Sequence, residues 1–321
     1  LHLLSRRQRQ MCIRDRAYYT MNYNTKDYKS QVQKLLRKAA IKKQFNKPII
    51  EWCLNNHLEK TATNIKTCGQ HIGITNVEGY AKIIKADFCR ERLCAICAWR
   101  RQSKFVAQMT PALTLLEKRG YQFIFATLTV NNVPYAELEE TINNMMRAYY
   151  LLYKRRRVAQ AWRGVTRSLE LTYNSEDDTL HPHIHLLIAV DEDYFTNQSK
   201  YISHDLLKSL WQDCLGVEYD PYVDARKVYN EGGAVVEVLK YALKPSKEDT
   251  ALSAFAYILK GRRLVSFTGV FAKVRKELKY SDFENILTDD FDKSKAVRYE
   301  LYSLDCTGGI YTYYKDCEVT L

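Results

Sequence analysis

The stretch Arg163–Val190, RGVTRSLELTYNSEDDTLHPHIHLLIAV, decides how the rest of the chain is interpreted. β-branched and apolar residues dominate its two ends, whereas Asn174–Leu180 between them is polar and typical of a turn. The pattern therefore predicts two strands that pair across this turn, one at Arg163–Tyr173 and one at His183–Val190.

Three of the seven histidines of the chain lie close together, at His181, His183 and His185. Residues i and i+2 of a strand project from the same face, so His183 and His185 can bind one metal ion while Ile184 faces the core. If the two strands pair, the carboxylate of Glu170 reaches the same ion. Two imidazoles and a carboxylate leave positions open for water and a phosphate oxygen. We therefore expect a catalytic divalent-metal site, with His181 as a marginal ligand or a support for the other two histidines.

The segments around this hairpin indicate an α+β domain. Their order is β-α-β-β-α-β-α, which favours helices packed on an antiparallel or mixed sheet. In addition to the hairpin, the pattern predicts a strand at Tyr121–Val130, a helix at Pro134–Leu152, a helix at Ser203–Cys214, a strand at Tyr222–Val228 and a helix from Gly233 to Pro245.

A cluster of cysteines precedes this domain. Cys94-Ala-Ile-Cys97 is a closely spaced pair, and Cys89, Cys68 and His71 lie upstream of it. Tetrahedral Zn²⁺ needs four nitrogen or sulfur ligands. We favour the four cysteines as ligands of a structural Zn²⁺, with His71 as an alternative fourth ligand. A redox pair is the other interpretation, but the βαβ context of such a motif is missing. Clustered thiols are typical of a reducing compartment, so we expect a cytoplasmic protein.

In the sequence EVLKYALK, at Glu237–Lys244, an acid, a tyrosine and a lysine are spaced so that they share one face of a helix. Glu237 and Tyr241 lie one turn apart on a helix, and Lys244 follows on the same face. A tyrosine hydroxyl beside a cation and a metal ion can attack a phosphodiester, and a carboxylate one turn away can accept its proton. The chain has 24 tyrosines, however, and most tyrosines on amphipathic helices are packing residues.

Composition indicates a globular protein, and its charge fits either a polyanionic partner or simply a basic enzyme. The chain has 321 residues, of which 46% are hydrophobic, and a net charge of +12. These values exclude a disordered tail, and no apolar run reaches the ~18 residues of a membrane span. The excess of basic charge favours nucleic acid as the partner. We expect DNA contacts from basic clusters that contain Arg100, Arg101, Arg155, Arg156 and Arg157, and also from Arg262–Arg263 and Lys273–Lys279.

Residues 1–16, LHLLSRRQRQMCIRDR, match in sequence and reading frame the translation of a sequencing-library adapter. We therefore expect them to be an artefact and Met21 to be the true start. A genuine basic arm or a mitochondrial presequence is the alternative. These residues hold five arginines and one aspartate, so the net charge of the remainder is +8.

Taken in order, the motifs resemble the rolling-circle replication initiator (Rep) proteins of small bacterial plasmids, within the HUH endonuclease superfamily. The resemblance covers the chain from about Cys68 to Lys244. It consists of FCRERLCAICAWRR at Phe88–Arg101, FATLTVNN at Phe125–Asn132, HPHIH at His181–His185 and EVLKYALK at Glu237–Lys244.

This resemblance implies an HUH/RRM-like domain with a central five-stranded antiparallel sheet and a metal-dependent nickase activity. His183 and His185 match the metal pair of the family, which binds Mg²⁺ or Mn²⁺, and Tyr241 matches its nucleophile. Glu237 matches the acid that the single-tyrosine branch uses in place of a second tyrosine. The four-cysteine zinc assignment also follows the family pattern.

The implied reaction nicks origin DNA at a single-stranded or hairpin segment, forms a 5′-phosphotyrosine link and frees a 3′-hydroxyl. Host helicase and DNA polymerase are the implied partners. Two other functions remain open, an HUH transposase or relaxase and a non-catalytic zinc-dependent DNA-binding protein with structural histidines.

Five regions are expected along the chain: the adapter-derived segment at 1–16, a basic helical region at 17–60, a zinc-binding Cys module at 61–117, the HUH endonuclease domain at 118–285, and a C-terminal tail of unknown role at 286–321.

Overall fold

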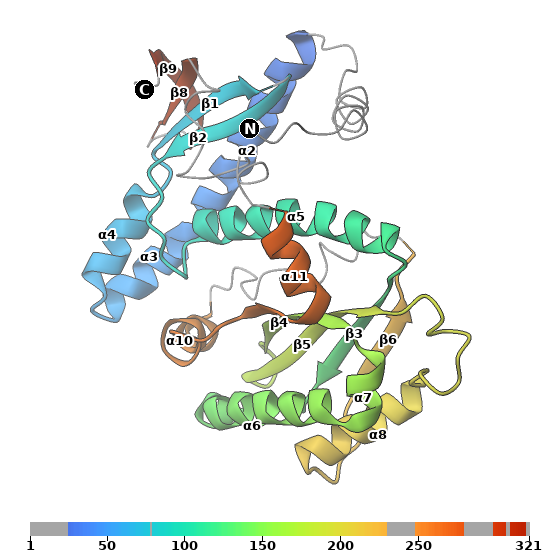
Figure 1. The fold of residues 1–321 in the computed structure, drawn as a ribbon. Coiled ribbons are helices and arrows are strands. Elements are labelled where there is room, and N and C mark those ends of the chain that lie inside the picture. The colour runs from blue at the N-terminus through green and yellow to red at the C-terminus, as the bar shows by residue number, and fades with distance from the viewer. Residues whose placement is uncertain (1–24, 78, 230–247, 279–297, 306–308, 319–321) are drawn as a thin grey trace, which may run out of the picture.

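The computed structural model describes residues 25–77, 79–229, 248–278, 298–305 and 309–318 (Figure 1). Two antiparallel sheets and the helices around them make up these residues, which confirms the predicted α+β class. None of the helices in this part of the chain is both long and apolar enough to cross a membrane. The predicted helix that carries Glu237, Tyr241 and Lys244 lies outside the described residues, as do residues 1–16.

The larger sheet has five strands, all antiparallel to their neighbours, as the resemblance to the Rep family implies. Across the sheet the strands are β6 (Val223–Lys227), β3 (Gln122–Thr129), β5 (Thr179–Val190), β4 (Gly164–Asn174) and β7 (Val265–Phe267). Strand β5 is therefore central and is paired on both sides over most of its length.

The central hairpin is longer than the sequence pattern indicates. Strand β5 begins at Thr179 rather than His183, because its first residues continue to pair with the end of β4. Pro182 lies within this extension, opposite Leu171. Strand β3 ends at Thr129, opposite His183, so at Pro182 the central strand is paired with β4 alone. A position with one open side tolerates a residue that has no N–H group.

Three helices cover one face of the five-stranded sheet, namely α6 (Tyr135–Lys154), α7 (Arg156–Ala161) and α8 (His204–Leu215). Figure 1 shows α6 and α8 together on this side. Alternate residues of β5, such as Ile184 and Leu186, pack against them in the main core. Ser203 caps α8, because its hydroxyl accepts a hydrogen bond from the N–H of Leu206 at 3.2 Å.

Helices α5 (Ala95–Lys118) and α11 (Gly269–Glu277) cover part of the opposite face, as Figure 1 shows. Leu187 and Ala189 of β5 are buried there in a second core cluster, together with Leu113 and Phe271 of the two helices. Because side chains alternate along a strand, the three histidines of β5 project from this same face, further toward the start of the strand.

A second sheet joins the two ends of the described chain. Its strand order is β2 (Tyr80–Ala86), β1 (His71–Val77), β8 (Arg298–Leu304) and β9 (Tyr311–Glu318). Half of this sheet thus comes from the region that the sequence leaves as a tail of unknown role. Helix α2 (Thr25–Gln44), whose helical pattern the sequence predicts, packs on the sheet through Val32, Leu36 and Ala39.

The short helices α3 (Asn46–Asn55) and α4 (Glu59–Thr67) lead from α2 to the cysteine cluster. Helix α10 (Asp249–Ser253) and the π-helix η1 (Ala254–Ile258) pack in the same core. Arg92, between two of the cysteines, donates hydrogen bonds to the carbonyl oxygens of Leu259 and Arg262. The cysteine region and the five-stranded sheet therefore share one continuous core.

Candidate active site and metal centres

The register of the central strand brings the predicted metal ligands together. Glu170 of β4 lies directly opposite His183 of β5, and Ser168 lies opposite His185. On the other side of β5, Thr127 of β3 lies opposite His185. Directly paired residues of neighbouring strands project from the same face, so the carboxylate and both imidazoles lie on one surface of the sheet.

The three ligand groups converge on one another. The Nε2 atom of His185 lies 2.8 Å from Glu170 Oε2, and that of His183 lies 3.5 Å from the same oxygen. One ligand atom from each residue can be chosen so that all three lie within 4.8 Å of one another. Such spacing fits a single divalent cation held by two nitrogens and one oxygen.

Each imidazole is oriented by a hydrogen bond at its second nitrogen. His183 Nδ1 lies 3.2 Å from the carbonyl oxygen of His181, and His185 Nδ1 lies 3.1 Å from Thr127 Oγ1. Because a carbonyl oxygen only accepts, Nδ1 of His183 donates to it, and Nε2 is the nitrogen that faces Glu170. Metal-binding histidines are oriented in this way. The sequence analysis did not predict this role for Thr127. The pairing of β3 with β5, which places Thr127 opposite His185, would have indicated it.

Glu170 is suited to bind a cation because it is held ionised. Its side chain is 4% exposed. Burial raises its pKa, but hydrogen bonds from His183 and His185 outweigh burial and bring the pKa to about 2. His181 lies outside the ligand group and stacks on the ring of His183 at 5.2 Å between centroids. Burial, and then the neighbouring His183, lower the pKa of His181.

A second group consists of the four predicted cysteines. Cys68 follows α4, Cys89 lies in the loop after β2, and Cys94 and Cys97 lie at the start of α5. Their sulfur atoms all lie within 4.8 Å of one another, with Cys68 Sγ 3.6 Å and Cys89 Sγ 3.7 Å from Cys97 Sγ. Four thiols at this spacing fit the tetrahedral site that Zn²⁺ requires. The alternative ligand His71 instead pairs with Asp87, with 2.8 Å between Nδ1 and Oδ2.

N–H groups surround these sulfurs, as expected where thiolates carry charge. The backbone N–H of Arg90 donates to Cys97 Sγ at 3.2 Å, and that of Cys89 donates to Cys68 Sγ at 3.5 Å. Hydrogen bonds from Cys68 and Cys89 lower the pKa of Cys94 and of Cys97, whereas the net effect of the neighbouring sulfurs and of burial raises the pKa of Cys68 and of Cys89. Deprotonated sulfur is the form that binds metal.

Asn46 supports the cysteine group from a distance in sequence. It is fully buried, its Nδ2 lies 3.5 Å from Cys94 Sγ, and its Oδ1 accepts a hydrogen bond from the N–H of Ala95 at 2.8 Å. The side chain thereby satisfies a free N–H group at the start of α5 and contacts a ligand sulfur at the same time. No local sequence pattern marks this role.

Five of the arginines predicted to contact DNA occupy two places. Arg100 lies over the ring of Phe88, with 4.4 Å from its Cζ to the ring centroid, and Arg101 donates to the carbonyl oxygen of Arg92 at 3.0 Å. The other three, Arg155–Arg157, lie where α6 meets α7, on the helical layer that covers the face opposite the histidines. Arg157 donates there to the carbonyl oxygens of Gln198 and Tyr201, at 2.8 and 3.0 Å.

Comparisons with known proteins show the family of the chain. The replication-protein family model Rep_1 matches residues 80–309. A protein rep of Streptococcus pneumoniae serotype 2 (strain D39) is 34% identical over 239 residues, which cover 71% of this chain and 75% of the relative. A protein rep of Bacillus amyloliquefaciens is 32% identical over 256 residues, covering 70% and 75%. One from Staphylococcus aureus is 36% identical over 167 residues, covering 51% and 73%.

No solved structure matches the chain. The family match spans Glu170, His183 and His185 and three of the four cysteines, from Cys89 to Cys97, and its extent exceeds half of the chain. The resemblance inferred from the motifs is thereby confirmed, and the chain belongs to the Rep family of replication proteins.

Proposed function

We propose that this protein initiates rolling-circle replication of a plasmid by nicking one strand of its origin. The observation that carries the proposal is the Glu170, His183 and His185 group, in which a carboxylate and two imidazole nitrogens converge on one face of the sheet. Replication-protein membership supplies DNA as the substrate. A ligand set with open positions is suited to binding a scissile phosphate.

The proposed chemistry is a phosphoryl transfer to tyrosine. A divalent cation, Mg²⁺ or Mn²⁺, would withdraw electron density from the phosphate when bound. The Tyr241 hydroxyl oxygen bonds to phosphorus, the bond from phosphorus to the 3′-oxygen breaks, and a 5′-phosphotyrosine link and a 3′-hydroxyl result. Glu237 or water accepts the tyrosine proton, and a proton reaches the leaving oxygen. Lys244 stabilises negative charge near the tyrosine.

The glutamate four positions before the proposed nucleophile in the sequence accounts for how the proposed reaction ends. A carboxylate can activate water to release the protein after one round, whereas a second tyrosine would permit another covalent transfer. We therefore assign termination to Glu237. The freed 3′-hydroxyl primes synthesis by a host DNA polymerase, and a host helicase unwinds the duplex.

We further propose that Cys68, Cys89, Cys94 and Cys97 hold a structural Zn²⁺. The support is the mutual approach of the four sulfurs and the N–H groups directed at them. Arg100 follows Cys97 closely in sequence, so a folded zinc site places this cation for a contact with duplex origin DNA. Arg155–Arg157 are a separate basic cluster, for which we propose contacts with phosphates of flanking DNA.

A nicking assay tests the catalytic proposal directly. Supercoiled plasmid that carries the cognate origin is incubated with the protein and Mg²⁺ or Mn²⁺, and relaxation and covalent protein–DNA adducts are measured. We expect both with the wild type and neither with Tyr241→Phe. Adduct formation at the wild-type level by that variant would refute the nucleophile assignment. Glu237→Ala is expected to spare the first nick more than termination.

A further inference from the structure

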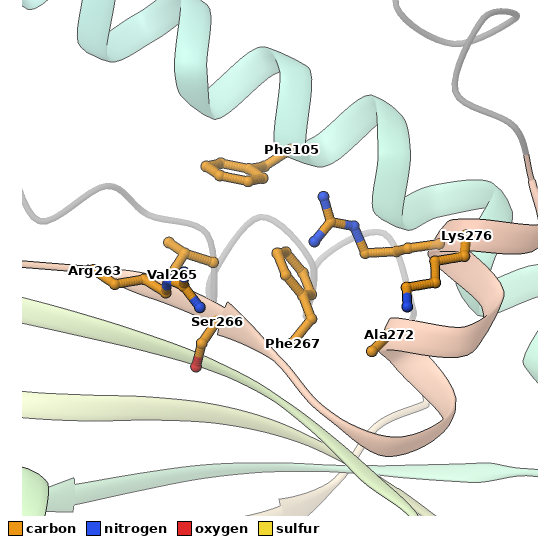
Figure 2. Close-up of a pocket in the computed structure, with 8 residues that line it drawn as sticks. Phe105, Arg263, Val265, Ser266, Phe267, Ala272 and Lys276 are labelled. Carbon is orange, nitrogen blue, oxygen red and sulfur yellow. The ribbon is translucent and has the colours of Figure 1, made fainter.

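A basic and aromatic pocket lies beside the histidine group. Its volume is about 440 Å³, within the ~300–1,000 Å³ range of small-ligand sites. Figure 2 shows the ring of Phe105 above that of Phe267, with Arg263 at one end of the pocket and Lys276 at the other. Helix α5, strand β7 and helix α11 supply its walls.

The strand register places this pocket on the same face as the candidate metal ligands. Val265 of β7, which lines the pocket, lies opposite Ser168 of β4, and Ser168 lies opposite His185. The pocket wall and His185 are thus at the same level of the sheet and two strands apart. With about 4.8 Å between strands, their separation is about 10 Å.

The chemistry of the lining is that of a nucleotide site. Arg263, Arg275 and Lys276 contribute three cations, and no acidic residue is among the described residues that line the pocket. The nearest acid along α11, Glu277, is bound by Arg119, with a distance of 3.0 Å between one guanidinium nitrogen and a carboxylate oxygen. Phosphate is therefore attracted to the pocket without competition from a carboxylate of the lining.

The aromatic residues of the pocket are held in place. The Arg275 guanidinium lies over the Phe267 ring, 3.6 Å from Cζ to the centroid, and it donates to Gln108 at 3.2 Å. The Phe105 and Phe267 rings are 6.0 Å apart and inclined by 43°. Rings and a guanidinium plane fixed in this way offer stacking surfaces to a flat group such as an unpaired base, at little cost in side-chain entropy.

We propose that this pocket holds one unpaired nucleotide of the DNA strand whose scissile phosphate lies at the histidine group. The base lies against Phe105 and Phe267, and Arg263 and Lys276 contact the adjoining phosphates. A base within a duplex cannot enter a recess walled by two helices, so the occupant is single-stranded. This inference rests on the proposed nicking function for the position of the scissile phosphate, but the binding it describes requires no catalysis.

The test compares two probes in buffer that contains no Mg²⁺ or Mn²⁺ and no chelator, so that the catalytic metal is absent and the zinc site stays intact. One is a short fluorescein-labelled oligothymidylate, and the other is an abasic oligomer with the same number of phosphates. We expect the wild type to prefer the probe with bases by about 10-fold, measured by fluorescence anisotropy. Phe267→Leu should reduce this preference about 5- to 10-fold by weakening oligothymidylate binding alone. An unchanged preference would overturn the proposal.

Substitution of two exposed cations tests the proposed phosphate contacts independently, because their side chains are not part of the packed core. Lys276→Ala and Arg263→Ala should weaken both probes equally and should each reduce the slope of log K against log salt by about 0.7. The matched controls are Tyr314→Leu and Lys315→Ala, another exposed aromatic and cation pair, on β9 of the other sheet. These should leave both affinities unchanged. An effect of the controls equal to that of the pocket variants would also overturn the proposal.

The same measurements separate this inference from the proposed function. His183→Ala should abolish nicking and leave the preference for bases intact. A wild type that prefers bases but never nicks its origin would refute the catalytic proposal alone. A wild type that nicks, but whose preference is insensitive to Phe267→Leu, would refute the pocket alone. Thermal unfolding of each variant verifies that it is folded, and if Phe267→Leu is not, Phe105→Leu takes its place.

Discussion

The ligand atoms of the histidine group lie as close together as those of the cysteine group, but the chain brings the two sets together in different ways. In each, the ligand atoms lie within 4.8 Å of one another. Glu170, His183 and His185 come from one hairpin, so the hydrogen bonds of two paired strands set their positions. The four cysteines come from the end of α4, a loop and the start of α5, which approach one another only when the chain between them has folded.

Both groups are largely buried, with Glu170 and His183 at most 9% exposed, so it is their ligand chemistry that differs. Cys68, Cys94 and Cys97 are at most 2% exposed and belong to the core that continues to α6 and the sheet. Four thiols complete a tetrahedral site and leave no position for a substrate, whereas two imidazoles and a carboxylate leave several. The difference teaches that the first group is suited to hold the fold together and the second to bind a reactant. Loss of the cysteine group should therefore unfold the protein, whereas loss of the histidine group should only inactivate it.

The largest effect should follow from breaking the cysteine group. We expect Cys97→Ala to abolish zinc binding and to lower the thermal midpoint severely, because a structural zinc supplies on the order of 10 kcal/mol of folding free energy. Metal analysis and circular dichroism measure both quantities. Cys53→Ala is the matched control, since Cys53 is equally buried in the same core but lies outside the group. Equal midpoints for the two variants would contradict the structural role.

Breaking the histidine group should leave the fold in place. His183→Ala is expected to reduce the nicking rate by at least about 10³-fold, because the variant lacks one of the three ligands that would hold the catalytic cation. Its thermal midpoint should stay within a few degrees of the wild type. His204→Ala, at the start of α8, is the control and should nick normally. If His183→Ala were unfolded, the histidine group would be needed for the fold as the cysteine group is, and the proposed difference between them would be wrong.

The difference in assembly also explains how much the sequence could predict. Strand alternation is local, so the pairing of Glu170 with His183 and His185 followed from one stretch of sequence. Four of the five strands of the larger sheet were predicted in the same way, each from its own stretch, whereas β7 was not. The cysteine spacing left His71 as an alternative, because nothing local reveals that His71 pairs with Asp87. The pairing of β1 with β8 joins residues more than 200 positions apart, which periodicity does not encode.

An intermediate effect should follow from removing the buried support of the cysteine group. Asn46→Ala leaves the N–H of Ala95 and Cys94 Sγ without their hydrogen bonds to Asn46. We expect a loss of about 1–3 kcal/mol in the free energy of unfolding and a 10- to 100-fold weaker zinc affinity. Denaturant titration and zinc competition with a chelator measure these. Asn56→Ala, which removes a bond to the carbonyl oxygen of Trp52, should change stability but not zinc affinity.

The smallest effect should come from the matching support of the histidine group. Thr127→Val keeps the shape of the side chain but removes the oxygen that lies 3.1 Å from His185 Nδ1, so the ring is no longer held in one orientation. We expect about a 10-fold weaker Mn²⁺ affinity, measured by titration of the nicking rate, with zinc content and thermal midpoint unchanged. Thr114→Val, at an exposed helical threonine of α5, is the control. The pairing of the strands places the three ligands without the hydroxyl, so its loss should change only the metal affinity. A loss of folding in Thr127→Val would show that the histidine group, like the cysteine group, contributes to the stability of the fold.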